Sequence, residues 1–146
     1  MNSAKHDSLL RAVIYSRVST DAQERDGTSL DTQETACAQY AQSKGWMKVE
    51  SIRDTASGAN LDRPGVDRVR ELLSHGLVDV VLSYAVDRLS RNQIHVAVLL
   101  DDIEKVGASL EFVTESFENT AVGRLILNVR AFSGEVEREK IAERTM

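Results

Sequence analysis

The stretch Leu10–Arg17 has the sequence LRAVIYSR, which is short, β-branched and apolar at its centre. This pattern is typical of a strand buried in the interior of a sheet. Three further strands are predicted along the chain, at Met47–Asp54, Val78–Ser83 and Ser109–Val113. Because helical stretches separate these strands, the sequence predicts a three-layer α/β domain in which helices flank a mostly parallel sheet.

The helices between the strands carry start and stop signals. Leu30–Lys44 opens with Asp31 and Glu34 at the spacing of a capping box. A second helix is predicted to begin at Pro64, because proline suits the first helical position. A third helix is predicted over Asn92–Val106, and a glycine closes each of the three.

The last segment, residues 121–146, predicts one long helix. Fully helical, it would be about 40 Å long. Val129, Phe132 and Val136 continue an apolar stripe with spacings of three and four residues. Two interpretations are open: a terminal helix packed on the sheet, or a helix that extends from the domain towards a second subunit.

Composition limits the possible functions. The chain has 146 residues, with 18 basic against 23 acidic side chains and a net charge of −5. A chain that gripped a nucleic-acid backbone alone would be basic, so any work on DNA needs a local basic cluster, a partner or a further domain. The single cysteine, Cys37, excludes a disulfide framework and an all-cysteine zinc site, and it suits a reducing cytoplasm.

Arginines gather at the predicted carboxyl edge of the sheet, where α/β proteins bind their ligands. The segments that follow three of the strands supply at least one arginine each, namely Arg17, Arg63, and the pair Arg88 and Arg91. Arginine forms bidentate hydrogen bonds with phosphate oxygens. Arg88 and Arg91 are three residues apart, so a helical turn would place them on one face. The edge is therefore a predicted phosphate site.

The histidines lie outside these loops, at His6, His75 and His95, and are predicted to be structural or exposed. A histidine-based triad is therefore poorly supported. Metal binding is also poorly supported, because Asp101 and Asp102 are adjacent on a helix and point in different directions. What remains is a serine surrounded by arginines, which suits phosphoryl transfer without a metal or another cofactor.

Four motifs, in order along the chain, resemble those of the serine site-specific recombinases, the resolvase and invertase superfamily. They are YSRVSTDAQ (Tyr15–Gln23) followed by SLDTQ (Ser29–Gln33), ASG with a downstream DR (Ala56–Arg63), VDRLSR (Val86–Arg91) and EREKIAERT (Glu137–Thr145). The long loop within the first motif and the sequence GRLILNVRAFSGEVERE (Gly123–Glu139) look most like the N-terminal catalytic domain of a large serine integrase.

The resemblance implies roles for individual residues. Ser19 would be the nucleophile that attacks a DNA phosphodiester, giving a 5′-phosphoserine link and a free 3′-hydroxyl. The scissile phosphate would be bound by Arg17, Arg63, Arg88, Arg91 and Arg138. These groups would be oriented by Gln33, Ser57, Asp87 and Glu137. Either Asp87 or an arginine would protonate the leaving oxygen.

The resemblance also implies an organisation. Residues 1–120 would form the catalytic core and residues 121–146 the start of a dimerisation helix, with DNA-binding domains absent from this chain. The partners would be DNA and further copies of the protein, as a homodimer that assembles into a tetramer in a bacterial or phage-infected cytoplasm. Two alternatives stay open: a non-catalytic α/β module for phosphorylated ligands or assembly, and a serine-dependent phosphodiester hydrolase.

Overall fold

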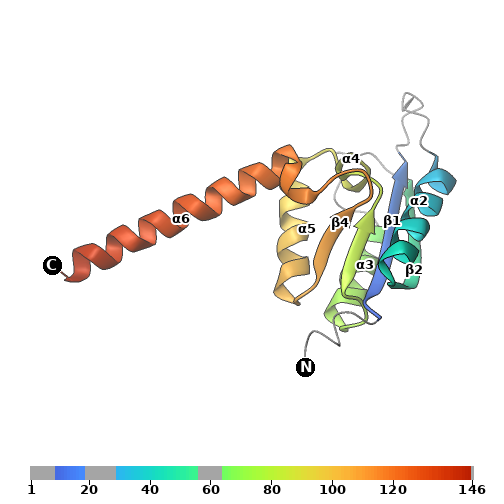
Figure 1. The fold of residues 1–146 in the computed structure, drawn as a ribbon, viewed down its shortest axis with the longest axis horizontal. Coiled ribbons are helices and arrows are strands. Elements are labelled where there is room, and N and C mark those ends of the chain that lie inside the picture. The colour runs from blue at the N-terminus through green and yellow to red at the C-terminus, as the bar shows by residue number, and fades with distance from the viewer. Residues whose placement is uncertain (1–8, 19–28, 56–63, 146) are drawn as a thin grey trace.

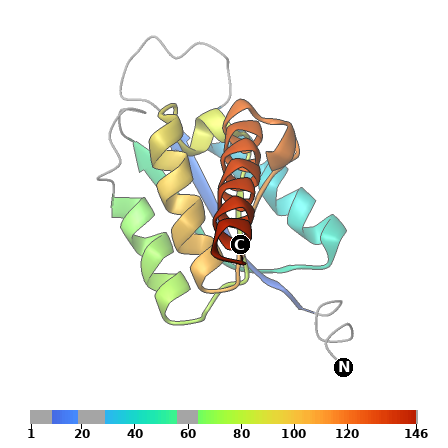
Figure 2. The same ribbon diagram turned by 90° about the vertical axis from the view of Figure 1, so that its left-hand side faces the viewer.

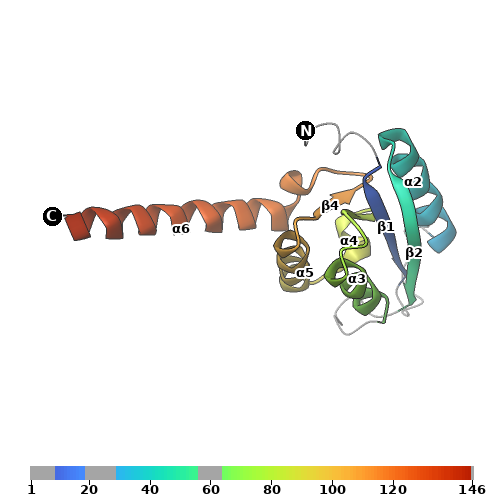
Figure 3. The ribbon, with the colours of Figure 1, turned by 90° about the horizontal axis from the view of Figure 1, so that it is seen from below.

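The structure, a computed structural model, describes residues 9–18, 29–55 and 64–145. These residues form one sheet with helices on both of its faces (Figures 1 and 3). The strands are β1 (Arg11–Val18), β2 (Met47–Thr55), β3 (Val80–Ser83) and β4 (Ser109–Phe112). The helices are α2 (Leu30–Lys44), α3 (Pro64–Ser74), α4 (Val86–Leu89), α5 (Gln93–Lys105) and α6 (Ala121–Thr145), with a 3-10 turn, η1 (Phe117–Asn119), before α6.

The sheet has the strand order β2-β1-β3-β4, and all three pairings between neighbouring strands are parallel. The carboxyl ends of the described strands therefore lie along one edge. This confirms the predicted three-layer α/β fold.

β1 is buried on both faces, as its apolar sequence predicts. Val13 and Tyr15 belong to the larger core, which α3 and α5 cover. Ile14, between them in sequence, faces the other way and packs with Cys37 and Ala41 of α2. Successive strand residues point to opposite faces, so this alternation places one helical layer on each side. Burial raises the pKa of the Cys37 thiol to about 12, which makes it an unreactive core group.

The start of α2 differs from the predicted capping box. Ser29 is the N-cap, and its hydroxyl accepts a hydrogen bond from the Thr32 amide at 3.1 Å. Asp31 and Glu34 lie inside the helix instead, where both carboxylates accept from Arg53 of β2, at 2.6 and 2.5 Å. The two acidic residues therefore tie α2 to the neighbouring edge strand.

α6 leaves the body of the molecule as an isolated helix (Figures 1 and 3), and Figure 2 looks nearly along it from its C-terminal end. Near its start Val122 is buried and Ile126 packs against the core. Arg130 donates to Glu104 of α5, and two residues later the Phe132 side chain is 65% exposed. The structure thus supports the interpretation of an extended helix over a packed one. No helix among the described residues, α6 included, is long and apolar enough to cross a membrane.

Candidate active site

Three predicted site residues, Ser19, Ser57 and Arg63, lie outside the described residues. Ser19 directly follows the last residue of β1, and Ser57 follows the end of β2 by two residues. The described part of the site is therefore the edge of the sheet from which both stretches depart.

Arg17 occupies the carboxyl end of β1 and is fully buried, with 0% of its surface exposed. Its Nη2 donates to the backbone oxygen of Asp87 at 2.6 Å. The Gln33 side chain, buried on α2, holds the Arg17 backbone from both sides. Its Oε1 accepts from the Arg17 amide at 3.3 Å, and its Nε2 donates to the Arg17 carbonyl at 3.0 Å. Gln33 thus fixes the backbone two residues before Ser19, because the glutamine amide offers both a donor and an acceptor.

Arg88 is the second buried arginine at this edge, with 1% of its surface exposed. It lies in α4, which immediately precedes the extended residue Ser90 (φ −166°, ψ 149°). Because the helix ends at Leu89, the prediction that Arg88 and Arg91 share a helical face is wrong. Arg88 points into the protein, whereas Arg91 is exposed.

Residues on either side of Arg88 line a hollow of about 210 Å³ where the α4 region meets the start of α6. Asp87, Ser90 and Arg91 form one wall, and Thr120 and Val122 contribute from the other. The hollow joins the predicted phosphate-binding residues to the root of the long helix.

Glu137 and Arg138 are not brought to this edge. Both are exposed and lie in the distal half of α6, which projects from the body (Figure 1). The structure therefore brings together Arg17, Gln33, Asp87, Arg88 and Arg91, and it separates Glu137 and Arg138 from them.

Asp54, near the end of β2, is a buried carboxylate that was not predicted from the sequence. It is 6% exposed, and it accepts from the Tyr15 hydroxyl at 2.7 Å and from the Gly65 amide at 2.9 Å. A Cβ at Gly65 would approach the Asp54 carboxylate to 2.5 Å, so only glycine allows this contact. Asp54 thereby joins β1 and β2 to the start of α3. Tyr15 itself is fully buried in the core.

Asp54→Ala should lower the free energy of unfolding by about 3 kcal/mol, because it leaves the Tyr15 hydroxyl and the Gly65 amide buried without their acceptor. Tyr15→Phe removes only one donor and should cost about 1 kcal/mol. Urea unfolding followed by circular dichroism measures both. In the Tyr15→Phe background, Asp54→Ala should cost less than it does alone. Strictly additive losses would contradict the Tyr15–Asp54 contact.

Another cleft of the molecule suits a phosphate less well than the carboxyl edge of the sheet. A larger cleft, of about 580 Å³, runs along β4, but three glutamates and one lysine line it, namely Glu111, Glu115, Glu118 and Lys44. This excess of carboxylates does not suit a DNA phosphate. Among the described residues, no three or more His, Cys, Asp or Glu side chains are grouped to hold a metal ion.

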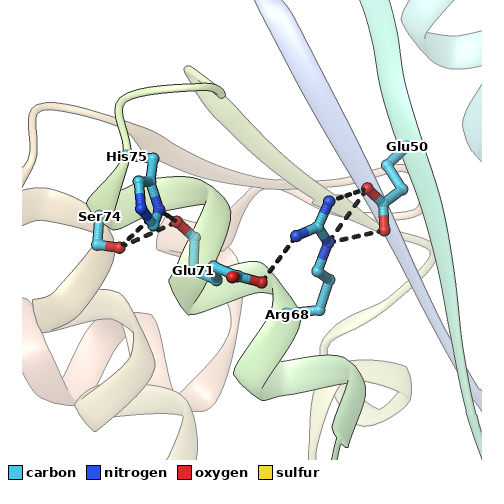
Figure 4. A network of polar contacts seen from close by, with 5 residues as sticks. All are labelled: Glu50, Arg68, Glu71, Ser74 and His75. Atoms are coloured by element: carbon cyan, nitrogen blue, oxygen red, sulfur yellow. Dashed lines mark hydrogen bonds and ion pairs between the residues drawn. The ribbon is translucent and has the colours of Figure 1, made fainter.

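Not every arginine marks a site. Arg68 of α3 forms an ion pair with Glu50 of β2 at 2.8 Å and one with Glu71 of its own helix at 2.7 Å (Figure 4). These carboxylates raise the pKa of Arg68, chiefly through their hydrogen bonds. Nearby, His75 Nδ1 donates to the Glu71 carbonyl at 2.8 Å (Figure 4), so His75 closes α3. This exposed network is structural, unlike the buried arginines Arg17 and Arg88.

Comparison with known proteins identifies the family to which the chain is similar. The family model for the resolvase N-terminal domain matches residues 12–146. A putative DNA recombinase of Bacillus subtilis (strain 168) is 38% identical over 132 residues, which are 90% of this chain and 26% of that protein. The serine recombinase gin of Escherichia phage Mu is 32% identical over 133 residues, which are 90% of this chain and 62% of that protein.

Among solved structures, the N-terminal catalytic domain of TP901-1 integrase matches with a TM-score of 0.70 and 34% identity, covering 88% of this chain and 97% of that one. The two curated relatives are longer, and the chain spans 26% and 62% of their lengths. The parallel sheet, the arginines at its carboxyl edge and the long final helix agree with this match. The chain therefore belongs to the resolvase N-terminal domain family of serine recombinases.

Proposed function

We propose that this chain is the catalytic part of an enzyme that carries out site-specific DNA recombination. The observation that carries the proposal is the burial of two guanidinium groups, Arg17 and Arg88, at the edge from which Ser19 follows β1. Burying a cation is unfavourable unless anions and polar groups surround it. Polar groups of the protein hold these guanidinium groups in place, and the oxygens of a DNA phosphodiester match the hydrogen-bonding geometry of guanidinium. The names of the relatives, a DNA recombinase and a serine recombinase, support the same function.

In the proposed reaction the Ser19 hydroxyl gives up its proton as its Oγ forms a bond to phosphorus, and the bond from phosphorus to the 3′ oxygen breaks, so one proton is lost and one is taken up. The 5′ end stays on the serine, and the 3′ oxygen leaves as a hydroxyl after taking a proton. Arg17, Arg63, Arg88 and Arg91 would stabilise the added negative charge of the transition state.

The reverse attack, by a 3′-hydroxyl on the phosphoserine, rejoins the strands after exchange. The covalent link retains the energy of the phosphodiester, so the cycle requires no ATP. Gln33, Ser57 and Asp87 would orient the reacting groups, with Asp87 or an arginine supplying the proton. Glu137 and Arg138 would act once α6 is placed within an assembly.

Ser19→Ala should abolish covalent attachment of the protein to DNA, because it removes the nucleophilic oxygen. The test joins the chain, through its C-terminal end, to a DNA-binding domain of known site and incubates it with a nicked duplex that carries this site. Because of the nick, the released fragment that ends in the free 3′-hydroxyl is short and diffuses away, so the adduct accumulates. A denaturing gel detects it, and mass spectrometry locates the attached residue.

Ser133→Ala is the matched control, because it removes an exposed hydroxyl from α6 and should leave the adduct unchanged. Cleavage without an adduct would favour the phosphodiester hydrolase. Binding without cleavage would favour the non-catalytic module. An adduct that persists in Ser19→Ala would contradict the role of Ser19.

The proposal divides the chain into a catalytic core, residues 1–120, and the start of a dimerisation helix, residues 121–146. DNA would be bound mainly through domains outside this chain, which is consistent with a net charge of −5 and with the greater length of the relatives. The setting would be the cytoplasm of a bacterium. A homodimer would assemble into a tetramer on the DNA.

The dimer would form through the apolar stripe of α6. Leu125, Val129 and Phe132 are 51%, 54% and 65% exposed, and they share one face of the helix. The stripe continues onto α5, where Ile94 and Val98 are also exposed and line a mostly apolar groove of about 380 Å³. Apolar surface of this kind marks an interaction site.

Phe132→Asp should weaken self-association of the chain, because it places a charge in the apolar face. Sedimentation over a series of concentrations measures the average mass. Ala131→Asp is the control: it adds the same charge one residue earlier, about 100° around the helix. Equal mass curves for Phe132→Asp and the unmodified chain, both rising with concentration, would contradict dimerisation through this stripe.

A further inference from the structure

α4 carries Asp87 and Arg88, yet it has no cap of its own. Its N-cap residue is Ala85, which makes no side-chain capping hydrogen bond. The first amides of a helix need acceptors from outside the helix. Here the acceptor for the Val86 amide is the carboxylate of Glu115, at 2.9 Å and 29 residues further along the chain.

Glu115 reaches this position because the β3–β4 pairing continues past the strands. The Val113 amide donates to the Ser83 carbonyl and the Thr114 amide to the Tyr84 carbonyl, both at 3.1 Å. The two segments therefore run side by side up to the start of α4. Glu115, the next residue, is half-buried beside Val86.

A helix of four residues holds its position weakly by itself, since it closes few internal hydrogen bonds. Arg17 supplies a second external contact, from its Nη2 to the Asp87 carbonyl at 2.6 Å. Glu115 and Arg17 thus hold adjacent residues, one by the Val86 amide and the other by the Asp87 carbonyl. Arg88 follows directly and is buried.

The segment that contains Glu115 also forms the hydrogen bonds that fix the start of α6. The Phe117 carbonyl accepts from the Thr120 hydroxyl at 2.7 Å, and the Thr120 hydroxyl accepts from the Gly123 amide at 3.0 Å. α4 lies at the same end of the sheet as the connection between β4 and α6 (Figure 1). Thr120 follows Glu115 by only five positions in the chain.

We propose that Glu115 is a positioning residue: its carboxylate fixes α4, and with it Asp87 and Arg88, to the segment that seats the long helix. Its importance for cleavage rests on the proposed function, whereas the contact itself does not. A displacement of the root of α6 would then reach Arg88 through this short connection.

The first test measures hydrogen exchange of backbone amides in Glu115→Ala and Glu115→Gln. Loss of the acceptor should raise the exchange rate of the Val86 amide about tenfold. Glutamine keeps an acceptor oxygen and should restore most of the protection. The Val81 amide, in β3, reports on global stability. Glu118→Ala removes an exposed carboxylate three residues later and is the control.

The second test measures the rate of adduct formation in the fusion described above. Glu115→Ala should slow it by about tenfold at unchanged DNA affinity, with rescue by glutamine. Unchanged exchange at Val86, or an equal rise at Val86 and Val81, would overturn the positioning role. If Glu115→Ala does not fold, Glu115→Gln decides, because protection like that of the unmodified chain is required. Altered exchange at Val86 with no adduct in the unmodified fusion would reject the proposed function alone.

Discussion

Arg88→Met is expected to slow DNA cleavage by about 100- to 1,000-fold, the usual loss when one preorganised group that stabilises transition-state charge is removed. Arg88 is buried at the carboxyl edge of the sheet, where the low dielectric strengthens its attraction to a phosphate. Methionine keeps most of the buried length and removes the charge. The rate of adduct formation in the nicked-duplex assay measures the effect.

Arg88→Lys separates charge from geometry. Lysine keeps the cation but lacks the planar fork of donors, so a large loss should remain. Arg68→Met is the matched control, because Arg68 pairs with Glu50 of β2 and Glu71 of α3, away from the site, and its loss should not affect cleavage. Urea unfolding verifies that each variant is folded. Cleavage by a folded Arg88→Met at near the normal rate would reject the role proposed for this arginine.

Gly123→Ala is expected to destabilise the protein by about 2–3 kcal/mol or to displace the root of α6, because the added carbon overpacks a tight contact. A Cβ at Gly123 would lie 2.0 Å from the Phe117 carbonyl oxygen and 3.0 Å from the Thr120 hydroxyl. The first of these is a backbone atom of η1, so no side-chain rotation can relieve the clash. Urea unfolding measures the destabilisation, and amide shifts in residues 117–126 report the displacement.

Gly134→Ala provides the opposite result in the same helix. A Cβ there meets only Arg138 Nη1, at 3.6 Å, an ordinary contact. Alanine should therefore stabilise α6 by about 0.5–1 kcal/mol, as expected for a helix interior. If the two substitutions had the same sign and size, the close packing at Gly123 would be disproved.

The fold was predictable because its signals are local. The apolar run of β1, the proline that begins α3 and the glycine that ends α2 each act over a few residues. Their alternation is enough to predict a parallel sheet and its functional edge. The bounds of α4 could not be predicted in this way, since four residues are too few to show helical periodicity.

The site was only partly predictable, because its contacts join distant segments. Tyr15 and Asp54 are 39 residues apart and meet because the parallel register places Tyr15 opposite Ile52, two residues before Asp54. Neither spacing nor composition reveals such a diagonal pair. Arg88 and Arg91 likewise do not share a face, because α4 ends at Leu89 and Ser90 is extended, whereas the sequence alone suggested one helical turn for both.

The projection of α6 has a mechanical consequence. With 25 residues the helix is a rod of about 37 Å, so a tilt of about 10° at its root would sweep its far end through about 6 Å. The close contact at Gly123 and the Arg130–Glu104 ion pair lie in the part of α6 nearest the body. They resist such a tilt only over a short lever arm. If two copies dimerised through α6, small changes in packing at the start of the helix would therefore change the relative orientation of their two cores.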